Sequence, residues 1–412
     1  MMSWIIQKWF ICMVQDWKEC SPLKRCAIIG AGPAGCFCAY YAQNQAQVTL
    51  FDFSSPLKTL LYTGGGRCNL AHAEYDFKDL AKNYPRGEKF LYSIFSRFST
   101  CDTLDFFEKI GVKTYVQDDG RIFPTSNSAL EVRTNILKAL SECEFVKTKV
   151  IGVHKKDDIF VVETSAGSYE FDSVVISIGG HAGFDLIEKT GHFVVEPRPA
   201  LTGLMSEESF FELSGVSVKS VEAFACFEFE GVKKADRFCG DLLFTHRGIS
   251  GPLVYQISSV FARCEFSKSN PLKIKFNFIQ GDIDFQKMLN ENSKKDVKNL
   301  LSEFVPKSLA NYIVKKCCTS FDIKCFEVDA KIRDSILKNL LEFEVNVVKP
   351  AKDGEIVTSG GVFLDEINPK TMESKLYKGL YFCGEVIDVD GFCGGFNLQN
   401  CWSTGFVAGS SI

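Results

Sequence analysis

The sequence predicts an α/β protein whose main domain is a Rossmann-like nucleotide-binding domain formed by two distant segments of the chain. Residues 26–52 contain a strand, a glycine-rich turn, a helix and a second strand in succession. A second glycine-rich, apolar segment begins after residue 346. A strand-like block and a lysine-rich helical block lie between the two segments and interrupt the domain as inserts. The expected division is an N-terminal extension over 1–23, a first half over 24–192, a β-rich insert over 193–278, a helical insert over 279–345 and a second half over 346–412.

The first glycine motif has the spacing of a dinucleotide-binding turn. In "CAIIGAGPAGCFCAYYAQNQAQVTLFD", Gly30, Gly32 and Gly35 follow an apolar strand and open a helix, and Asp52 ends the next strand. The first glycine permits a tight turn, the second lets the backbone approach a pyrophosphate, and the third lets the helix pack closely on the strand. The Asp52 carboxylate would accept hydrogen bonds from an adenosine ribose and repel a 2′-phosphate, so NADP is disfavoured at this site.

A second glycine run, "YTGGGRCNLAH" over residues 62–72, lies outside that turn. Glycine inside regular structure costs roughly 0.5–1 kcal/mol relative to alanine, so three consecutive glycines indicate backbone that passes close to another group. We therefore expect Gly64, Gly65 and Gly66 to form a second close approach of bare backbone to a ligand, with Arg67 and Cys68 beside it.

The other elements follow from the hydrophobic period and the turn residues. In order, they are a helical segment from residue 91 that ends at Gly111, a helix that begins near 126–128, a three-stranded meander over 146–153, 158–164 and 168–171, a buried strand that ends at Gly179 and Gly180, a strand over 380–383 and a helix that begins near 396–399. The amino terminus of this last helix, which carries the positive end of the helix dipole, would point at the group that the preceding loop encloses.

Composition narrows the function classes. The chain has 412 residues, a formal net charge of −4, a pI near 5.9 and no basic run longer than a pair, which together predict no nucleic-acid partner. Its 17 cysteines form no Cys-x-x-Cys motif, which predicts reduced thiols, a cytoplasmic location and no metal site. Residues 1–23 are too short and too interrupted by polar residues to span a bilayer core of about 30 Å.

Several blocks of the sequence together resemble a known family. They are "IIGAGPAG" with the later "LFD", then "KTLLYTGGGRCN", "GDLLFTHRGISGP", and the text from "TSGGV" through "GLYFCGEVIDVDGFCGGFNLQNCWSTG". From about Lys24 onward, this text resembles the BaiN-type or aminoacetone-oxidase-like flavoproteins, a family of NAD(P)/FAD-dependent oxidoreductases. The resemblance implies a glutathione-reductase-like FAD-binding domain in two sequence halves, interrupted by a β-rich subdomain and a small helical subdomain.

The resemblance also implies which residues bind FAD. Those expected around the pyrophosphate and ribose are Gly30, Gly32, Pro33, Ala34, Gly35 and Asp52, with Val150 near the adenine. Those expected beside the rest of the cofactor are Lys58, Thr63, Gly64, Gly65, Gly66, Arg67, Cys68 and Asn69. Gly179 and Gly180 would close over the cofactor, Gly384, Glu385 and Asp388 would approach its ribityl and pyrophosphate groups, and Gly394, Gly395, Phe396, Asn397 and Leu398 would approach the flavin ring.

The catalytic residues stay open, with three candidates. Cys68 would be a redox or nucleophilic thiol whose thiolate fraction Arg67 raises, or a small buried group that packs against the ring. His72 stands where the family pattern usually has a different polar residue, and it lies beside the expected site. His246 occurs in a glycine-punctuated loop and would contact the substrate or lie on the surface.

The favoured function is that of an FAD-dependent oxidoreductase acting on a small organic substrate. One version is a reductase or desaturase for an enone-like compound, with NAD(P)H reducing the flavin directly as a transient co-substrate. The alternatives are an oxygen-using amine or aminoketone oxidase and a non-catalytic flavin-binding redox sensor. No second Gly-x-Gly-x-x-Gly follows a strand, so no separate nicotinamide domain is expected, and the sequence indicates no oligomeric state.

Overall fold

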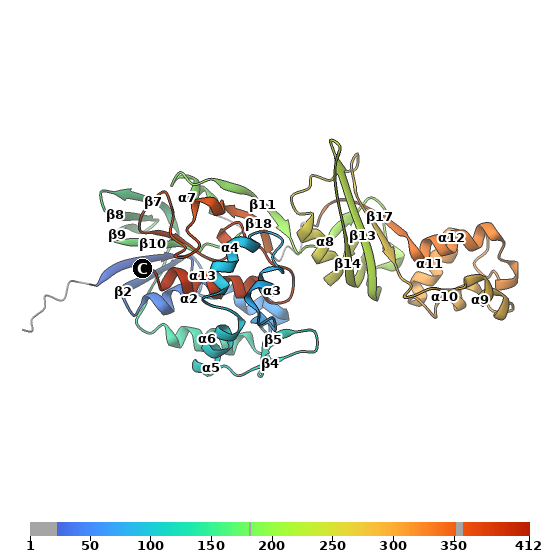
Figure 1. Ribbon diagram of the computed structural model, residues 1–412, viewed down its shortest axis with the longest axis horizontal. Helices are drawn as coiled ribbons and strands as arrows, with labels where there is room; N and C mark the ends of the chain where they lie inside the picture. The colour runs from blue at the N-terminus through green and yellow to red at the C-terminus, as the bar shows by residue number, and fades with distance from the viewer. Residues whose placement is uncertain (1–22, 181–182, 352–356) are drawn as a thin grey trace, which may run out of the picture.

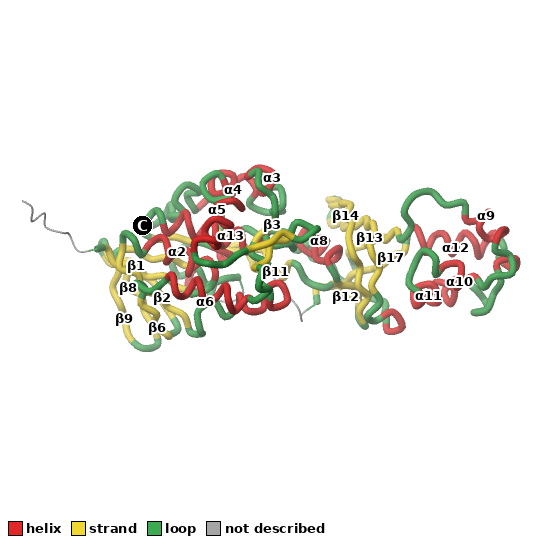
Figure 2. The backbone as a smooth tube through the Cα atoms, turned by 90° about the horizontal axis from the view of Figure 1, so that it is seen from below, coloured by secondary structure: helices red, strands yellow, loops and turns green. Residues whose placement is uncertain are grey.

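The computed structural model describes residues 23–180, 183–351 and 357–412, so the expected N-terminal extension lies outside the described residues except for Leu23. Three parts follow one another along the longest axis: a nucleotide-binding domain, a β-barrel and a helical insert (Figure 1). A view from below shows the same order (Figure 2). The barrel therefore lies between the other two parts.

A five-stranded parallel sheet forms the centre of the nucleotide-binding domain. The strands, in spatial order, are β19 (Leu380–Phe382), β10 (Ser173–Ile176), β1 (Lys24–Ile29), β2 (Ala46–Asp52) and β6 (Glu144–Lys147). The last four residues of β1 and all of β10 are buried, as expected for a parallel sheet covered on both faces. Since β19 comes from the end of the chain, both halves contribute strands, and the predicted α/β class is confirmed.

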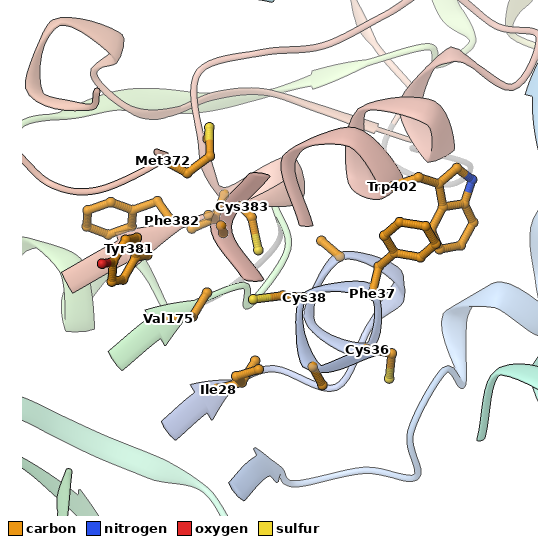
Figure 3. Close-up of a cluster of buried hydrophobic side chains, with 14 of the residues drawn as sticks. Ile28, Cys36, Phe37, Cys38, Val175, Met372, Tyr381, Phe382, Cys383 and Trp402 are labelled. Atoms are coloured by element: carbon orange, nitrogen blue, oxygen red, sulfur yellow. The ribbon is translucent and has the colours of Figure 1, made fainter. Parts of the chain in front are cut away.

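Helices α2 (Pro33–Ala42) and α13 (Phe396–Gly409) pack directly against each other beside this sheet. Figure 3 shows Phe37 of α2 next to Trp402 of α13, and their ring centroids are 5.3 Å apart. The buried Trp402 indole also donates a hydrogen bond to the Leu70 carbonyl oxygen at 2.9 Å. The two ends of the chain thus share one hydrophobic core.

The segment from residue 91 is two helices rather than the single helix expected. Helix α4 (Glu88–Phe95) ends before α5 (Thr100–Lys109) begins. Between them Ser99 and Asp102 form a capping box, in which the Ser99 N–H donates to the Asp102 carboxylate at 2.7 Å. Such a box satisfies the free N–H groups of a new helix start, which the hydrophobic period alone does not reveal.

The predicted meander also begins later than expected. Residues 146–153 divide between β6, which pairs in parallel with β2, and β7 (Val150–Lys156), which pairs with β8 (Ile159–Thr164) in a different sheet. Strand β9 (Gly167–Phe171) completes the three-stranded antiparallel sheet. The apolar residues of 146–153 continue across this change of partner, so the sequence pattern alone does not reveal it.

The remaining elements of this domain surround the core. They are the short sheet β3 (Ala71–His72), β4 (Thr114–Val116) and β5 (Arg121–Pro124), and the helices α3 (Phe77–Ala81), α6 (Ala129–Ala139) and α7 (Phe184–Glu188). Helix α6 begins after Ser128, where the sequence predicts a helix start.

The β-rich insert closes into a six-stranded barrel, reached through the ribbon of β11 (Val194–Ala200) and β18 (Val357–Val362). The barrel strands are β12 (Leu204–Ser206), β15 (Gly248–Ser250), β14 (Val232–Thr245), β13 (Ser217–Phe229), β16 (Leu272–Asn277) and β17 (Phe343–Pro350), accompanied by α8 (Pro252–Val260). The boundary expected at residue 346 falls inside β17. The helical insert contains α9 (Phe285–Glu291), α10 (Val297–Leu301), α11 (Lys307–Cys317) and α12 (Ala330–Leu341).

A buried ion pair lies where the nucleotide-binding domain meets the barrel. Both oxygens of the fully buried Asp390 carboxylate accept hydrogen bonds from the Arg86 guanidinium. The same guanidinium donates to the Ser259 carbonyl oxygen of α8 at 2.8 Å. Beside this pair, Arg263 after α8 forms an ion pair with Asp388. These contacts hold α8 against the loop that precedes α13.

We expect Asp390→Leu alone to lower the free energy of unfolding by about 3–5 kcal/mol, because it leaves the Arg86 guanidinium buried without a counter-charge. The double variant Arg86→Met/Asp390→Leu should recover most of that loss, since it removes both charges. Urea unfolding followed by circular dichroism measures both values. Equal losses in the single and double variants would show that the unpaired Arg86 charge is not what destabilises Asp390→Leu.

Candidate functional site

The expected cofactor residues lie at the carboxyl ends of the parallel strands. Gly30, Asp52, Ser177 and Gly384 follow or end β1, β2, β10 and β19 respectively. In open α/β sheets, ligands bind in the crevice outside these strand ends. The topology therefore gathers segments from residue 30 to residue 384 at one edge of the sheet.

The three motif glycines have different reasons to be glycine. Gly30 has φ +103°, and a Cβ there would lie 2.7 Å from the carbonyl carbon of Ser177. A Cβ at Gly35 would collide with the Gly30 carbonyl oxygen. At Gly32, the N-cap of α2, a Cβ would meet nothing within 4 Å. The first and third glycines therefore permit internal packing, whereas the second leaves open space at a helix amino terminus, where anions bind.

Asp52 is held by the backbone of the turn that it faces. One carboxylate oxygen accepts a hydrogen bond from the Ala31 N–H at 2.8 Å, and the other accepts from the Ser54 N–H at 2.7 Å. The Asp52 carbonyl oxygen accepts from the Thr148 N–H at 2.9 Å, which brings the start of β7 at Val150 close to the same strand end. These contacts fix the carboxylate next to the glycine turn.

The second glycine run has three consecutive residues in the left-handed region. The φ values of Gly64, Gly65 and Gly66 are +56°, +68° and +85°. A residue with a side chain rarely adopts this conformation, and three in succession require glycine. A Cβ at Gly64 would lie 2.8 Å from the Asn69 nitrogen, whereas one at Gly65 would meet nothing within 4 Å. Gly64 therefore packs against Asn69, whereas the backbone at Gly65 faces open space.

Cys68 is a fully buried thiol rather than an exposed nucleophile. Burial raises the pKa of this thiol to about 12, although a hydrogen bond with Thr63 lowers it. The Arg67 guanidinium lies 4.1 Å from the centre of the Phe123 ring, which it contacts as a cation on an aromatic face. A thiol with this pKa is protonated at neutral pH, so Cys68 supplies no thiolate.

His72 lies against the loop that begins α13. Its Nδ1 is 3.1 Å from the Gly394 carbonyl oxygen, and its ring stacks on Phe396 with centroids 4.6 Å apart. Because a carbonyl oxygen only accepts hydrogen bonds, Nδ1 carries the proton in this contact. The buried Tyr84 hydroxyl donates to the Phe396 carbonyl oxygen at 2.6 Å. The structure thus brings His72 together with the residues expected at the flavin ring.

The loop after β19 is tied to neighbouring elements. Gly384 has φ +82°, and a Cβ there would lie 2.5 Å from the Ala34 side chain of α2. Glu385 accepts a hydrogen bond from the Thr358 N–H at 2.7 Å. Burial raises the pKa of Asp388, although the neighbouring Arg263 lowers it. The carboxylate of Asp388 therefore contacts the barrel, an interaction that the sequence did not reveal.

Other expected site residues differ in their surroundings. Gly179 has φ +81° with open space around it, and a Cβ at Gly180 would contact Thr358. Lys58 is exposed before the glycine run, and the Asn397 side chain exchanges two 2.8 Å hydrogen bonds with the Gly391 backbone. His246 lies in the exposed turn between β14 and β15. Its ring is 5.3 Å from that of Phe211, and its carbonyl oxygen accepts from the Ser209 hydroxyl.

A family model described as "HI0933-like protein Rossmann domain" matches residues 24–411. The chain belongs to the HI0933-like family. The resemblance to BaiN-type flavoproteins is thereby confirmed, and this family member is an FAD-dependent oxidoreductase with a Rossmann-type FAD-binding domain.

Three curated relatives match this HI0933-like protein over nearly their whole length. It is 29% identical to the ribosomal RNA dihydrouridine synthase of Escherichia coli (strain K12) and 30% identical to that of Haemophilus influenzae, in both cases over 93% of this chain and 97% of the relative. It is 26% identical to the 3-dehydro-bile acid Δ(4,6)-reductase of Clostridium scindens, over 94% of this chain and 98% of the relative.

These relatives overturn one prediction. The exclusion of nucleic acid is wrong, because two full-length relatives are enzymes named for ribosomal RNA. The prediction failed because the net charge is a sum over the whole chain, whereas RNA binding depends on the charge of the part of the surface that contacts the RNA. Within the described part of the chain, no helix is both long enough and apolar enough to cross a bilayer.

The residues at the strand ends fit FAD. Open space over Gly32 suits a pyrophosphate at the α2 amino terminus, and the bare backbone of Gly65 suits a flat ring that side chains would obstruct. The side-chain oxygen of Asn69 is buried without a hydrogen-bond partner among the described residues. Buried polar atoms are normally paired, so this oxygen indicates a donor that the polypeptide does not itself provide.

Replacement of Gly32 by Val should leave a folded protein that binds FAD at least tenfold more weakly, because the side chain fills space that the fold itself does not use. Gly35→Ala is the contrasting variant: its Cβ would collide with the Gly30 carbonyl oxygen, so it should lower the melting temperature even without cofactor. FAD titration and thermal denaturation of the apoprotein distinguish the two effects. Unchanged FAD affinity in Gly32→Val would remove that glycine from the cofactor site.

Iodoacetamide should spare Cys68 in the native protein at pH 8, because a thiol of pKa about 12 is ionised to only about one part in ten thousand. The exposed Cys101 and Cys239 should react under the same conditions and serve as internal controls. Peptide mass spectrometry after timed alkylation measures the three rates. If Cys68 in the native protein were labelled as fast as Cys239, Cys68 would again be a candidate nucleophile.

Proposed function

We propose that this protein reduces uridine to dihydrouridine in RNA, with NAD(P)H as the electron donor to its flavin. The observation that carries the proposal is the similarity to two ribosomal RNA dihydrouridine synthases over 93% of the chain. The match includes both inserts, which a similarity limited to the FAD-binding core would leave out. RNA then replaces the small organic molecule as the favoured substrate.

The third relative supports the type of reaction. Formation of dihydrouridine saturates the C5=C6 bond of uracil, which is conjugated to the C4 carbonyl group. The name of the 3-dehydro-bile acid Δ(4,6)-reductase likewise describes carbon–carbon double bonds conjugated to a ketone. Reduction of a double bond conjugated to a carbonyl group would add a hydride to the carbon distant from the carbonyl group and a proton to the carbon next to it. The common chemistry is therefore reduction of an activated carbon–carbon double bond.

The residues around the expected flavin site suit such a reduction. A bound flavin would supply the hydride. The amino terminus of α13, at Gly395 and Phe396, would place its positive dipole end beside the negative charge of the reduced cofactor. His72 donates its Nδ1 proton to the Gly394 carbonyl oxygen, so a proton for the substrate would have to come from Nε2. We assign the proton to no second residue, since the Cys68 side chain is fully buried.

The proposed donor, NAD(P)H, would reach the flavin directly without a nicotinamide domain of its own, because the sequence holds one dinucleotide-binding turn, at Gly30 to Gly35, and FAD would occupy it. A second candidate function is reduction of a small enone, which the 26% identity to the bile-acid reductase favours. The two candidates share the flavin chemistry and differ in the substrate alone.

Under anaerobic conditions, NADH or NADPH should bleach the flavin absorbance of the purified protein, and unmodified ribosomal RNA should then restore it. Nucleoside mass spectrometry of that RNA should reveal dihydrouridine. The flavin-poor variant Gly32→Val provides the control.

Three other results would contradict the proposal in different ways. Reoxidation by a steroid enone but not by RNA would favour the small-molecule reductase. Bleaching by an amine and not by NAD(P)H would favour an oxidase. A flavin that no donor reduces would favour a redox sensor.

A further inference from the structure

The outer face of the barrel carries an aromatic ring between two cations. Phe224 points outward from β13 and is partly exposed. Its register partner on β14 is Arg237 and its register partner on β16 is Lys275, so all three side chains share one row across the sheet. The Arg237 guanidinium carbon lies 5.7 Å from the centre of the Phe224 ring.

The next row on the same face has small side chains and a third cation. Cys226 of β13 pairs with Ala235 on one side and with Lys273 on the other. Lys273 and Arg237 are exposed, and neither forms an ion pair with a carboxylate within the described part of the chain. Because Cys226 and Ala235 are short, a flat ring could lie on the surface beside Phe224.

Carboxylates occur at the edges of this face. Along β13, Glu222 precedes the Phe224 row and Glu228 follows the Cys226 row on the same face. Glu344 of β17 pairs in register with Lys275. Lys275 itself forms a 2.6 Å ion pair with Glu342. The two central rows of β14, β13 and β16 are therefore cationic while the barrel insert as a whole is balanced, which explains why net charge did not predict them.

The hairpin of β13 and β14 extends this face beyond the barrel (Figure 1). Phe229 and Val232 pair across its tip and are 53% and 73% exposed. Near the tip, the Lys234 ammonium donates to the Val260 carbonyl oxygen at the end of α8 at 2.6 Å. The same end of α8 contacts Arg86 and Asp390 of the nucleotide-binding domain. The tip end of the hairpin therefore lies toward the expected flavin site.

We propose that this face, defined by Phe224, Cys226, Ala235, Arg237, Lys273 and Lys275, binds single-stranded RNA that flanks the target uridine. The inference rests on the proposed function for its choice of RNA. Proteins bind single strands by stacking bases on aromatic rings or guanidinium planes while cations contact the phosphates. The row of Arg237, Phe224 and Lys275 provides both kinds of contact on one sheet face, and its charge is complementary to that of RNA.

The test uses the FAD-loaded full chain and a fluorescein-labelled, unmodified ribosomal RNA fragment that contains single-stranded uridines. Phe224→Ala should weaken binding by roughly tenfold or more through lost stacking. Arg237→Gln should weaken it and lower the slope of log affinity against log salt by about 0.7, the effect of one phosphate contact on a single strand. Phe224→Leu preserves apolar packing without a stacking face and should behave like Phe224→Ala.

Matched controls come from the helical insert. Phe326→Ala removes a ring that is 68% exposed, and Lys331→Gln removes an exposed cation, so both should leave RNA affinity unchanged. Bleaching of the flavin by NAD(P)H should be the same in all variants, because none of the altered residues is among those expected to bind the cofactor. Fluorescence anisotropy measures affinity, and the dihydrouridine assay measures KM and kcat, of which KM alone should rise.

The outcomes separate this inference from the proposed function. If the unaltered protein forms dihydrouridine while the Phe224 and Arg237 variants bind RNA normally, the barrel face is not the RNA site and the proposed function stands. If the variants lose RNA affinity but no uridine is reduced, the face binds RNA and the proposed substrate is wrong. If the unaltered protein binds no RNA, the inference is overturned and a protein partner becomes the occupant to seek.

Discussion

The packing of α2 on α13 through bare backbone is the constraint on which the rest of the structure depends. Gly405 and Gly409 face α2, where a Cβ at Gly405 would lie 2.7 Å from the Ala34 carbonyl oxygen and one at Gly409 would collide with that of Cys38. Two helices from opposite ends of the chain can approach this closely only when one of them lacks side chains at the contact. Their approach brings the turn at Gly32 and the loop at Gly395 to one edge of the sheet.

The sequence predicted the parts of this arrangement that depend on local rules. The motif from Gly30 to Asp52 has one structural interpretation, because Gly30 and Gly35 have no room for a side chain while Gly32 leaves open space at the start of α2. The starts of α6 and α13 follow from capping and glycine signals in the same way. The break at Ser99 between α4 and α5 was missed although its capping box is visible in the sequence, because the apolar period continues across it.

Long-range polar contacts could not be predicted from one sequence. Nothing local marks Arg86 as the partner of Asp390, which lies 304 residues away, or connects Asp388 with Arg263. The chemical state of Cys68 was equally hidden, since its raised pKa comes from burial by distant segments rather than from the adjacent Arg67. The positions of the glycine turns could thus be predicted from the sequence, whereas the partners of the charged side chains and the protonation state of Cys68 could not.

The separation of core and inserts explains how one fold can serve relatives named for substrates as different as ribosomal RNA and a bile acid. Hydride transfer would need a flavin held in place at the strand ends, where the expected cofactor residues lie. In the proposal made above, recognition of the RNA instead uses outward side chains of the barrel, which its core does not constrain. Arg86, paired with the buried Asp390, also donates to the Ser259 carbonyl oxygen of α8, and this contact connects the barrel to the loop before α13. On the proposal above, changes to the barrel face would change the substrate while the redox chemistry of the nucleotide-binding domain stays the same.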